Sequence, residues 1–594
     1  MPARHPACRR RLPHAAAPAP ATPAEASAPA PRPRDGHRPG RADGRVDGRV
    51  THARDRRHGD DRHHYGYDRQ GHAPFPDDPD APGLRQHRLT CRTPRAPALP
   101  PPHRDRPCSQ ARPTPPLPTR SPALRTRTLL LAAGLTTGLL TTALPAGTAV
   151  AAPSGLAGDF NGDGYRDVAI GAMSADVGSV QSAGAVVVLY GSSSGVSAAR
   201  KTVITQNSAG VPGAAEYGDR FGNSLAAGDL DRDGYSDLVV GAQYEAIGDR
   251  DGVGSATVIW GGKNGLSGGK GLPQPSTLSE WGGFSSGVAT GDFDGDGATD
   301  VTITGQSRTR LYKGPFTRTN GPASHTSIGE FGSTYEVFAG DMSGDGAAER
   351  VYPFLVDGDE GGEISYHRWT GTKYARTYLP QADGEKGTIA DVNGDGYGDL
   401  VLGDYQDPRP ARPTGHKGGQ ITVWYGGPTG PDPAQTPTVI HQDTAGVPGS
   451  GESDDLFGSA VGAGDVNGDG YADIAVGAWA EDIGTVEDAG SVTILFGSAS
   501  GLSGKGAKSY SQDTAGVPGS NETMDAFGMT VRLVDLDKNG RADLVSGAGY
   551  ENGYGAVTVL RGSASGLTPS GSKFLSARDV SLKGGADFAW AIAQ

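Results

Sequence analysis

The sequence predicts an all-β fold, a seven-bladed β-propeller whose ring is closed by the C-terminal strand pairing with the first blade. An Asp-rich loop of the general form D-x-[DN]-x-[DN]-G-x-x-D recurs seven times between Asp159 and Asp543, at intervals of 49 to 74 residues. Short Val, Ile and aromatic runs bounded by Gly, Ser and Pro flank the loops, which is typical of strands. Self-similarity at such a period indicates repeats that bury their faces against one another.

Each repeat contains up to four β-rich runs. A run beginning with FG precedes most loops, as in FGNSLAAGD (221–229) and FGSAVGAGD (457–465). An apolar run such as DLVVGA (237–242) follows the loop directly, and a third run such as GSVTILFGSASG (490–501) comes next. A fourth run is present in places, for example KTVITQ (201–206). Four strands per repeat, taken seven times, describe the blades of a β-propeller.

The two ends of the repeat region complement each other. The first loop, at Asp159, has no FG run before it, whereas the chain finishes with FAWAIAQ (588–594). Joined to Gly158-Asp159, this end reads FAWAIAQGD and has the length of FGNSLAAGD. We therefore expect the last strand to complete the first blade, which would also remove the exposed strand edges of an open array.

Charge and residue usage divide the chain into two parts. Residues 1–151 hold 25 Arg, no Lys, 12 acidic residues, all three Cys and ten of the fourteen His, whereas residues 152–594 carry a net charge of −26. The Pro-, Arg- and His-rich residues 1–123 are expected to be disordered, because they show no period that could bury a core. Their basic charge is scattered and broken by Pro, so no nucleic-acid partner is expected.

Residues 124–151 predict a secretory signal peptide. Arg125 and Arg127 precede an apolar stretch that ends at Ala149-Val150-Ala151, an A-x-A cleavage pattern. Thr and Gly dilute that stretch, so no permanent membrane span is expected. Since a signal peptide belongs at a start, we expect translation to begin near Leu124 and residues 1–123 not to be made. The mature propeller, 152–594, would be secreted and extracellular, and without Cys it would need staples other than disulfides.

The Asp-rich loops predict calcium sites. Ca²⁺ takes six to eight oxygen ligands, and each loop offers side-chain oxygens at its first, third, fifth and ninth positions, with the seventh carbonyl as a further source. An EF-hand is rejected, because it would need Glu at position twelve and flanking helices. The expected ligands are Asp159, Asn161, Asp163, Tyr165 and Asp167; Asp229, Asp231, Asp233, Tyr235 and Asp237; Asp292, Asp294, Asp296, Ala298 and Asp300; Asp341, Ser343, Asp345 and Glu349; Asp391, Asn393, Asp395, Tyr397 and Asp399; Asp465, Asn467, Asp469, Tyr471 and Asp473; and Asp535, Asp537, Asn539, Arg541 and Asp543.

These ions, about six or seven, would be structural. The seven loops contain 23 of the 55 acidic residues of 152–594, and packing them together without a cation would be repulsive. Asx-turns that bind nothing are the alternative reading. The fourth loop, DMSGDGAAE (341–349), departs from the pattern through Ser343 and Glu349, so its occupancy stays open.

The motifs resemble a known family. The FG runs, the Asp-rich loops and the G-A endings of VAIGAM (168–173) and LVVGAQ (238–243) look like FG-GAP repeats, which build the seven-bladed propeller of integrin alpha subunits. The resemblance spans residues 155–594. It implies that the loops bind calcium between two strands of a blade, on the face opposite the main ligand surface. QDTAGVPG (442–449 and 512–519) resembles segments of secreted bacterial members.

No catalytic residues stand out. Outside residues 1–151 the four His are scattered and are expected to lie on the surface, and GFSSG (283–287) does not open a helix as a nucleophile elbow requires. Most Trp are expected to pack between blades. Acids before the FG runs, as in ESDDLFG (452–458), are either turn residues or part of a polar rim.

We therefore expect a monomeric extracellular binding or adhesion module for a protein or carbohydrate ligand. The alternative is an extracellular carbohydrate-active hydrolase or lyase on a propeller scaffold, since propellers also host such enzymes.

Overall fold

The computed structural model describes residues 153–275, 282–305, 309–328, 334, 336–355, 362–409, 413–585 and 587–593. The expected disordered segment (1–123) and signal peptide (124–151) lie outside the described residues. All described strands belong to one compact unit, Thr136–Gln594. Within the described ranges the only helix is the single turn η1 (Glu551–Gly553), and none has the length and apolar character needed to cross a membrane.

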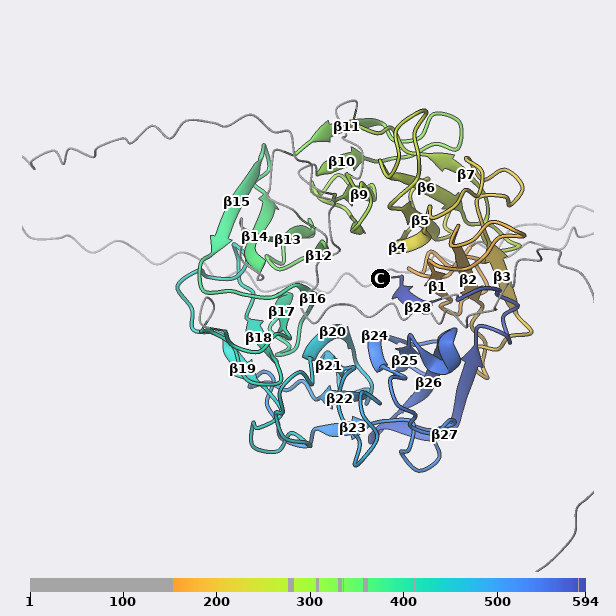
Figure 1. Ribbon diagram of the computed structural model, residues 1–594. Helices are drawn as coiled ribbons and strands as arrows, with labels where there is room; N and C mark the ends of the chain where they lie inside the picture. Colours follow the sequence, from red (N-terminus) through yellow and green to blue (C-terminus); the bar gives the residue numbers. More distant parts are fainter. Residues whose placement is uncertain are drawn as a thin grey trace, which may run out of the picture. The chain divides into compact units, whose positions relative to one another are not determined.

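The strands form seven four-stranded antiparallel sheets, arranged as blades in a ring (Figure 1). Blade 1 contains β28 (Phe588–Ile592), β1 (Val168–Ala172), β2 (Ala185–Leu189) and β3 (Lys201–Ile204). Blade 2 contains β4 (Phe221–Gly228), β5 (Asp237–Ala242), β6 (Ser255–Trp260) and β7 (Ser267–Gly271). Blade 3 contains β8 (Val288–Gly291), β9 (Asp300–Ile303), β10 (Arg310–Lys313) and β11 (Ser324–Ser327). Blade 4 contains β12 (Phe338–Gly340), β13 (Glu349–Leu355), β14 (Gly362–Trp369) and β15 (Tyr374–Leu379).

The other three blades follow the same order. Blade 5 contains β16 (Lys386–Ala390), β17 (Asp399–Asp404), β18 (Gln420–Trp424) and β19 (Thr438–Ile440). Blade 6 contains β20 (Phe457–Gly464), β21 (Asp473–Ala478), β22 (Ser491–Leu495) and β23 (Lys508–Tyr510). Blade 7 contains β24 (Phe527–Val534), β25 (Asp543–Ala548), β26 (Ala556–Ser563) and β27 (Gly566–Ser576). The predicted all-β, seven-bladed fold is confirmed.

The C-terminal strand closes the ring, as predicted. β28 pairs antiparallel with β1, with Ile592 opposite Ile170, and it forms the innermost strand of blade 1 (Figure 1). The Ala593 N–H also donates to the Ala169 carbonyl at 2.9 Å. Behind this pair, buried Val side chains of blade 1 and blade 7 share one hydrophobic cluster with Phe588. The two ends of the repeat region therefore pack as any other neighbouring blades do.

A phenylalanine at or just before the innermost strand fastens five blades to the preceding blade. The backbone N–H of each phenylalanine donates to a carbonyl of the preceding blade at 2.8–3.1 Å. The pairs are Phe221 with Ala183, Phe284 with Val253, Phe457 with Gly418, Phe527 with Ala489, and Phe588 with Tyr554. Each ring is at most 1% exposed. A glycine with a φ of 83–91° faces each phenylalanine, and a Cβ there would lie 2.1–2.3 Å from the phenylalanine carbonyl oxygen. Only glycine fits such a contact.

The residue after the phenylalanine also has a left-handed backbone. Gly222, Gly458 and Gly528 have φ values of 94°, 100° and 90°. Ala589 takes the corresponding place in β28 and has a φ of 80°, although it is not glycine. The register read from FAWAIAQ is therefore correct, and blade 1 adopts it at a cost of roughly 1 kcal/mol in backbone strain.

The strand order fixes what each face of the ring carries. In blades 2 to 7 the innermost strand leads through an Asp-rich loop into the second strand, and in blade 1 the loop directly precedes the second strand, β1. All seven loops therefore emerge on one face, here called the loop face. Because the strands are antiparallel, the connections from second to third strand, and from each blade to the next, lie on the opposite face.

Candidate metal centres

The seven loops share one backbone conformation, held by their own carboxylates. In every loop the first Asp accepts a hydrogen bond from the N–H of the Gly at position six, at 2.7–3.0 Å. The side-chain oxygen at position five accepts from the N–H at position seven, at 2.8–3.1 Å. These are Asx-type turns, and they gather the oxygen-bearing side chains around each loop.

The acid at position nine connects the loop to its blade. In all seven loops it accepts the N–H at position two, at 2.7–3.3 Å. In six of them its other oxygen accepts the N–H of a glycine at or just after the end of the third strand, at 2.8–2.9 Å. Burial, and to a lesser extent the nearby loop carboxylates, raise the pKa of Asp237 to about 7 and that of Asp300 to about 6. A buried acid of this kind calls for a compensating cation.

Three loops bring three carboxylates together. In loops two, three and seven, oxygens from positions one, three and nine all lie within 4.8 Å of one another. These triads are Asp229, Asp231 and Asp237; Asp292, Asp294 and Asp300; and Asp535, Asp537 and Asp543. Two of their oxygens, Asp231 Oδ1 and Asp294 Oδ1, are buried without a hydrogen-bond partner. Since a buried carboxylate oxygen is costly to leave unpaired, this all-oxygen donor set fits a hard cation such as Ca²⁺.

Each of these three loops also contacts a basic side chain through its third position. Arg318, from the β10–β11 connection of blade 3, contacts Asp231 at 2.6 Å and Asp233 at 2.7 Å across the blade boundary. Lys313 pairs with Asp294, and Arg561 pairs with Asp537, each within its own blade. In loops one, five and six the third position is Asn. An acid at position three is therefore accompanied by a fixed positive charge.

The loops with Asn at position three are held by that amide. Asn161 Oδ1 accepts the Asp163 N–H at 2.9 Å. In loops five and six the Asn Nδ2 group donates to the fifth-position carboxylate, at 3.0 Å from Asn393 to Asp395 and at 2.9 Å from Asn467 to Asp469. The amide thus lowers the repulsion among the carboxylates of these three loops.

The fourth loop is different, as its sequence suggests. Ser343 Oγ donates to Glu349 Oε1 at 2.9 Å, so two of the expected ligand positions are paired with each other. Glu349 Oε2 accepts the N–H groups of Met342 and Ser343, at 2.7 and 3.1 Å. Both oxygens of the longer acid thereby accept hydrogen bonds from within the loop. A cation has less to gain here than in the other six loops.

Neighbouring loops are joined to one another. The backbone N–H at position eight donates to the carbonyl of the first Asp in the preceding loop at five blade boundaries, at 2.7–3.0 Å; the donors are Ser236, Ala348, Gly398, Ala472 and Ala542. The position-seven side chains Tyr235, Tyr397, Tyr471 and Arg541 lie against the position-four glycine of that preceding loop. The loops therefore form a linked series around the loop face.

Two groups on the opposite face were not assigned from the sequence. Gln206, Gln442 and Gln512 each donate through Nε2 to a glutamate of the next blade, Glu245, Glu481 and Glu551. The acids before the FG runs are turn residues: Asp219, Asp455 and Asp525 accept the N–H three residues earlier at 2.6–2.7 Å. The recurrence of Gln and Glu at fixed places in the repeats was the signal that could have revealed these pairs.

The histidines correct one expectation. His325 is exposed, but His367 is only 7% exposed, and burial followed by the charges of Arg350 and Arg376 lowers its pKa to about 3. His416 and His441 are partly buried and stack on each other. The expectation of surface histidines is therefore wrong for His367. Of the described Trp, Trp260 and Trp424 are buried, whereas Trp369, Trp479 and Trp590 are half-buried.

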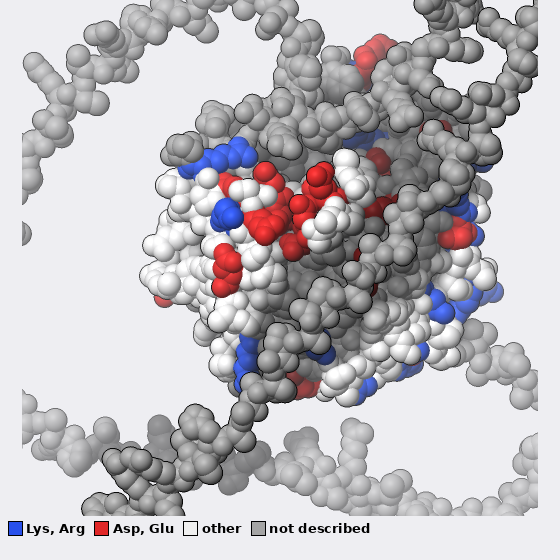
Figure 2. Space-filling view, turned by 60° about the horizontal axis from the view of Figure 1, so that its bottom comes forward, with Lys and Arg blue, Asp and Glu red and all other residues white. Residues whose placement is uncertain are grey.

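Acidic side chains gather on the surface shown in Figure 2, where Lys and Arg are separate and scattered around them. This distribution agrees with the excess of acidic residues in 152–594. A surface of this sign attracts cations and repels polyanions.

Comparison with known proteins supports the repeat assignment. The FG-GAP repeat family matches residues 151–189, 221–259, 457–495 and 527–560, and the FG-GAP-like repeat family matches 292–352. Integrin alpha-IIb of Mus musculus is 34% identical over 197 residues, which cover 32% of this chain and 16% of that protein. Phosphatidylinositol-glycan-specific phospholipase D of Bos taurus is 30% identical over 209 residues, covering 34% of this chain and 23% of that protein.

The chain thus spans less than a quarter of the length of these relatives.

Among solved structures, one describes the recognition of non-reducing terminal N-acetylglucosamine by a lectin of Agrocybe aegerita. It aligns with a TM-score of 0.42 at 15% identity, covering 72% of this chain and 94% of that one.

Proposed function

Because this chain is an FG-GAP repeat propeller similar to those of integrin alpha subunits, we propose that it is a calcium-stapled extracellular binding module for a protein or carbohydrate ligand. The observation that carries the proposal is that the two faces of the ring differ: one is regular and the other is variable. The loop face repeats one oxygen-rich conformation in all seven blades, whereas the connections of the opposite face differ in length and content. The β17–β18 connection spans 405–419, for example, and the β5–β6 connection spans 243–254.

Calcium would be held in six loops: one, two, three, five, six and seven. The side chains at positions one, three, five and nine would supply oxygens, and the seventh carbonyl would add another. The ion would neutralise the clustered carboxylates and satisfy the buried oxygens of Asp231 and Asp294. Loop four, with Ser343 bonded to Glu349, is the exception. The ions would thus stabilise the blades rather than take part in a reaction.

Calcium stoichiometry tests the first half of the proposal. Equilibrium dialysis of the full chain with radioactive calcium should give six bound ions. Asp465→Ala removes the first ligand of loop six and should lower the count to five, whereas Asp341→Ala in loop four should leave it at six. Equal losses in both variants, or no bound calcium in the wild type, would contradict the assignment.

Ligand capture tests the second half. The full chain, in calcium and in chelator, is applied to an array of polysaccharides and extracellular-matrix proteins. Calcium-dependent retention without product supports a binding module. Release of shortened sugar chains would favour the alternative, a carbohydrate-active hydrolase or lyase. Absence of retention by folded, calcium-loaded protein across the array would count against both.

A further inference from the structure

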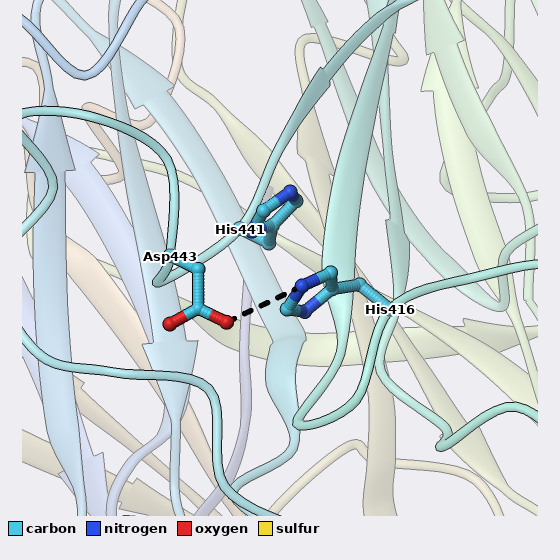
Figure 3. Close-up of side chains that lie close together, drawn as sticks. All are labelled: His416, His441 and Asp443. Carbon is cyan, nitrogen blue, oxygen red and sulfur yellow. Dashed lines mark ion pairs between the residues drawn. The ribbon is translucent and has the colours of Figure 1, made fainter.

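Two histidines of blade 5 meet on the face opposite the Asp-rich loops. His416 lies in the β17–β18 connection, and His441 follows β19 directly, so 25 positions of chain separate them. Their imidazole rings are stacked, with centroids 3.5 Å apart and planes inclined by only 7° (Figure 3). Asp443 lies beside the stack, and its Oδ2 is 3.4 Å from His416 Nε2. One ligand atom from each of the three residues lies within 4.8 Å of the other two.

Hydrogen bonds hold His416 and Asp443 so that one ligand atom of each faces the other. His416 Nδ1 donates to the Lys417 carbonyl oxygen at 2.7 Å, so Nε2, the atom that faces Asp443, is the nitrogen placed to bind a metal. Histidines that bind metals typically donate their other N–H to a carbonyl in this way. Asp443 Oδ1 accepts the Gly451 N–H at 3.1 Å, which leaves Oδ2 available.

His441 supplies an independent indication. Its Nδ1 atom is buried and has no hydrogen-bond partner. The stacked arrangement thus leaves a buried imidazole nitrogen unsatisfied.

We propose that His416, His441 and Asp443 form a site for one transition-metal ion of the Zn²⁺ class. Ligands at about 2.1 Å from a tetrahedral ion are about 3.4 Å apart, which matches the separation of His416 Nε2 and Asp443 Oδ2. Two parallel rings cannot both direct in-plane lone pairs at one ion, so one imidazole turns about its Cβ–Cγ bond on binding. Three protein ligands leave the fourth position to water or to a group from an external ligand.

The chemistry separates this site from the Asp-rich loops. Imidazole ligands suit zinc, copper and nickel, whereas calcium takes oxygen ligands. The site also lies on the opposite face, in the connections that vary between blades. It does not depend on the identity of the ligand proposed above.

The repeats show that these histidines are not needed for the backbone. The segment after the outermost strand recurs in blades 1 and 6, where Thr205 and Ser511 take the place of His441. All three residues use their N–H in the same way: His441 donates to Thr444 Oγ1 at 3.0 Å, and Thr205 and Ser511 make the equivalent bond at 2.9 Å. The substitution His441→Thr therefore copies a conformation that the chain already adopts.

The test compares zinc binding by the full chain and by H441T, both saturated with calcium. Competition titration against a zinc indicator should show one site in the wild type that is weakened by at least about 100-fold in H441T, since a direct ligand matters more than the 10–100-fold typical of second-layer residues. The ten histidines of residues 1–151 are present in both proteins, so only the difference is read. Identical zinc titrations of the two proteins would overturn the proposal.

Chemical modification of individual histidines gives a second, residue-specific test of the zinc site. Diethyl pyrocarbonate modifies free imidazoles, so zinc should protect His416 and His441 in the wild type but leave the exposed His325 reactive. In H441T, zinc should no longer protect His416. If zinc leaves the reactivity of His416 and His441 unchanged in the wild type, the site does not exist.

Discussion

Replacing Phe588 by Ala tests whether the C-terminal strand is a full member of blade 1. Phe588 is completely buried, and its N–H donates to the Tyr554 carbonyl of blade 7 at 3.1 Å. Phe527 has the same role in blade 7, with complete burial and a 3.0 Å bond to Ala489. Truncating a fully buried phenylalanine to alanine costs about 3–5 kcal/mol. We therefore expect F588A and F527A to lower the free energy of unfolding by similar amounts within that range.

The assay is urea unfolding followed by tryptophan fluorescence, with calcium held in excess so that loop occupancy stays constant. Tyr217→Ala is the control, because Tyr217 is 78% exposed and its loss should change the free energy by less than about 0.5 kcal/mol. If F588A resembles Y217A while F527A is strongly destabilised, the C-terminal strand does not close the ring. Hydrogen exchange at β1 should then also be fast in the wild type.

Three further predictions concern the backbone, the metals and pH. Ala589→Gly should stabilise the protein by about 0.5–1 kcal/mol in the same urea assay, because glycine relieves the positive φ of 80°; Gly490→Ala, whose Cβ would lie 2.2 Å from the Phe527 carbonyl oxygen, should destabilise it. Chelation should lower the melting temperature, since each site at a calcium concentration 100 times its Kd contributes about 2.7 kcal/mol; an unchanged melting curve would contradict structural calcium. Burial, and then nearby acids, raise the pKa of Glu245 and Glu481 to about 7, so the folded state binds more protons than the unfolded state and these groups stabilise it most below pH 4.5, an effect lost as the pH rises through 7. E245Q/E481Q should therefore show a weaker decline of stability between pH 5 and 7.5 than the wild type, and parallel pH curves would refute the assignment.

The fold could be predicted because its signals are local and repeated. The Asp-rich loop fixes the connection between the first and second strands, and its seven copies fix the number of blades. Ring closure followed from aligning FAWAIAQ with the FG runs, and the positive φ of Ala589 shows that the alignment is correct to the residue. Every expected ligand position lies in such a loop.

What the sequence did not reveal depends on contacts between distant residues. Arg318 lies 87 positions after Asp231, and no local pattern links them, because their contact depends on how two blades pack. His416 and His441 are 25 positions apart in the sequence. They meet because the β17–β18 connection, which is longer than the β5–β6 connection, reaches the segment that follows β19. The ninth-position acid was expected as a metal ligand, but its two backbone hydrogen bonds in six loops require the third strand to be in place.

Both faces of the ring solve the same problem, which is that no blade buries its own sides. On the loop face, the first Asp of one loop accepts a backbone N–H from the next loop. On the opposite face, phenylalanine contacts join five pairs of neighbouring blades, and Gln–Glu pairs reinforce three of these. Since these links use backbone atoms and a few fixed side chains, the remaining residues of the opposite connections are free to differ. That freedom explains how a pair of histidines can occupy blade 5, whereas blades 1 and 6 have Thr205 and Ser511 at the place of His441.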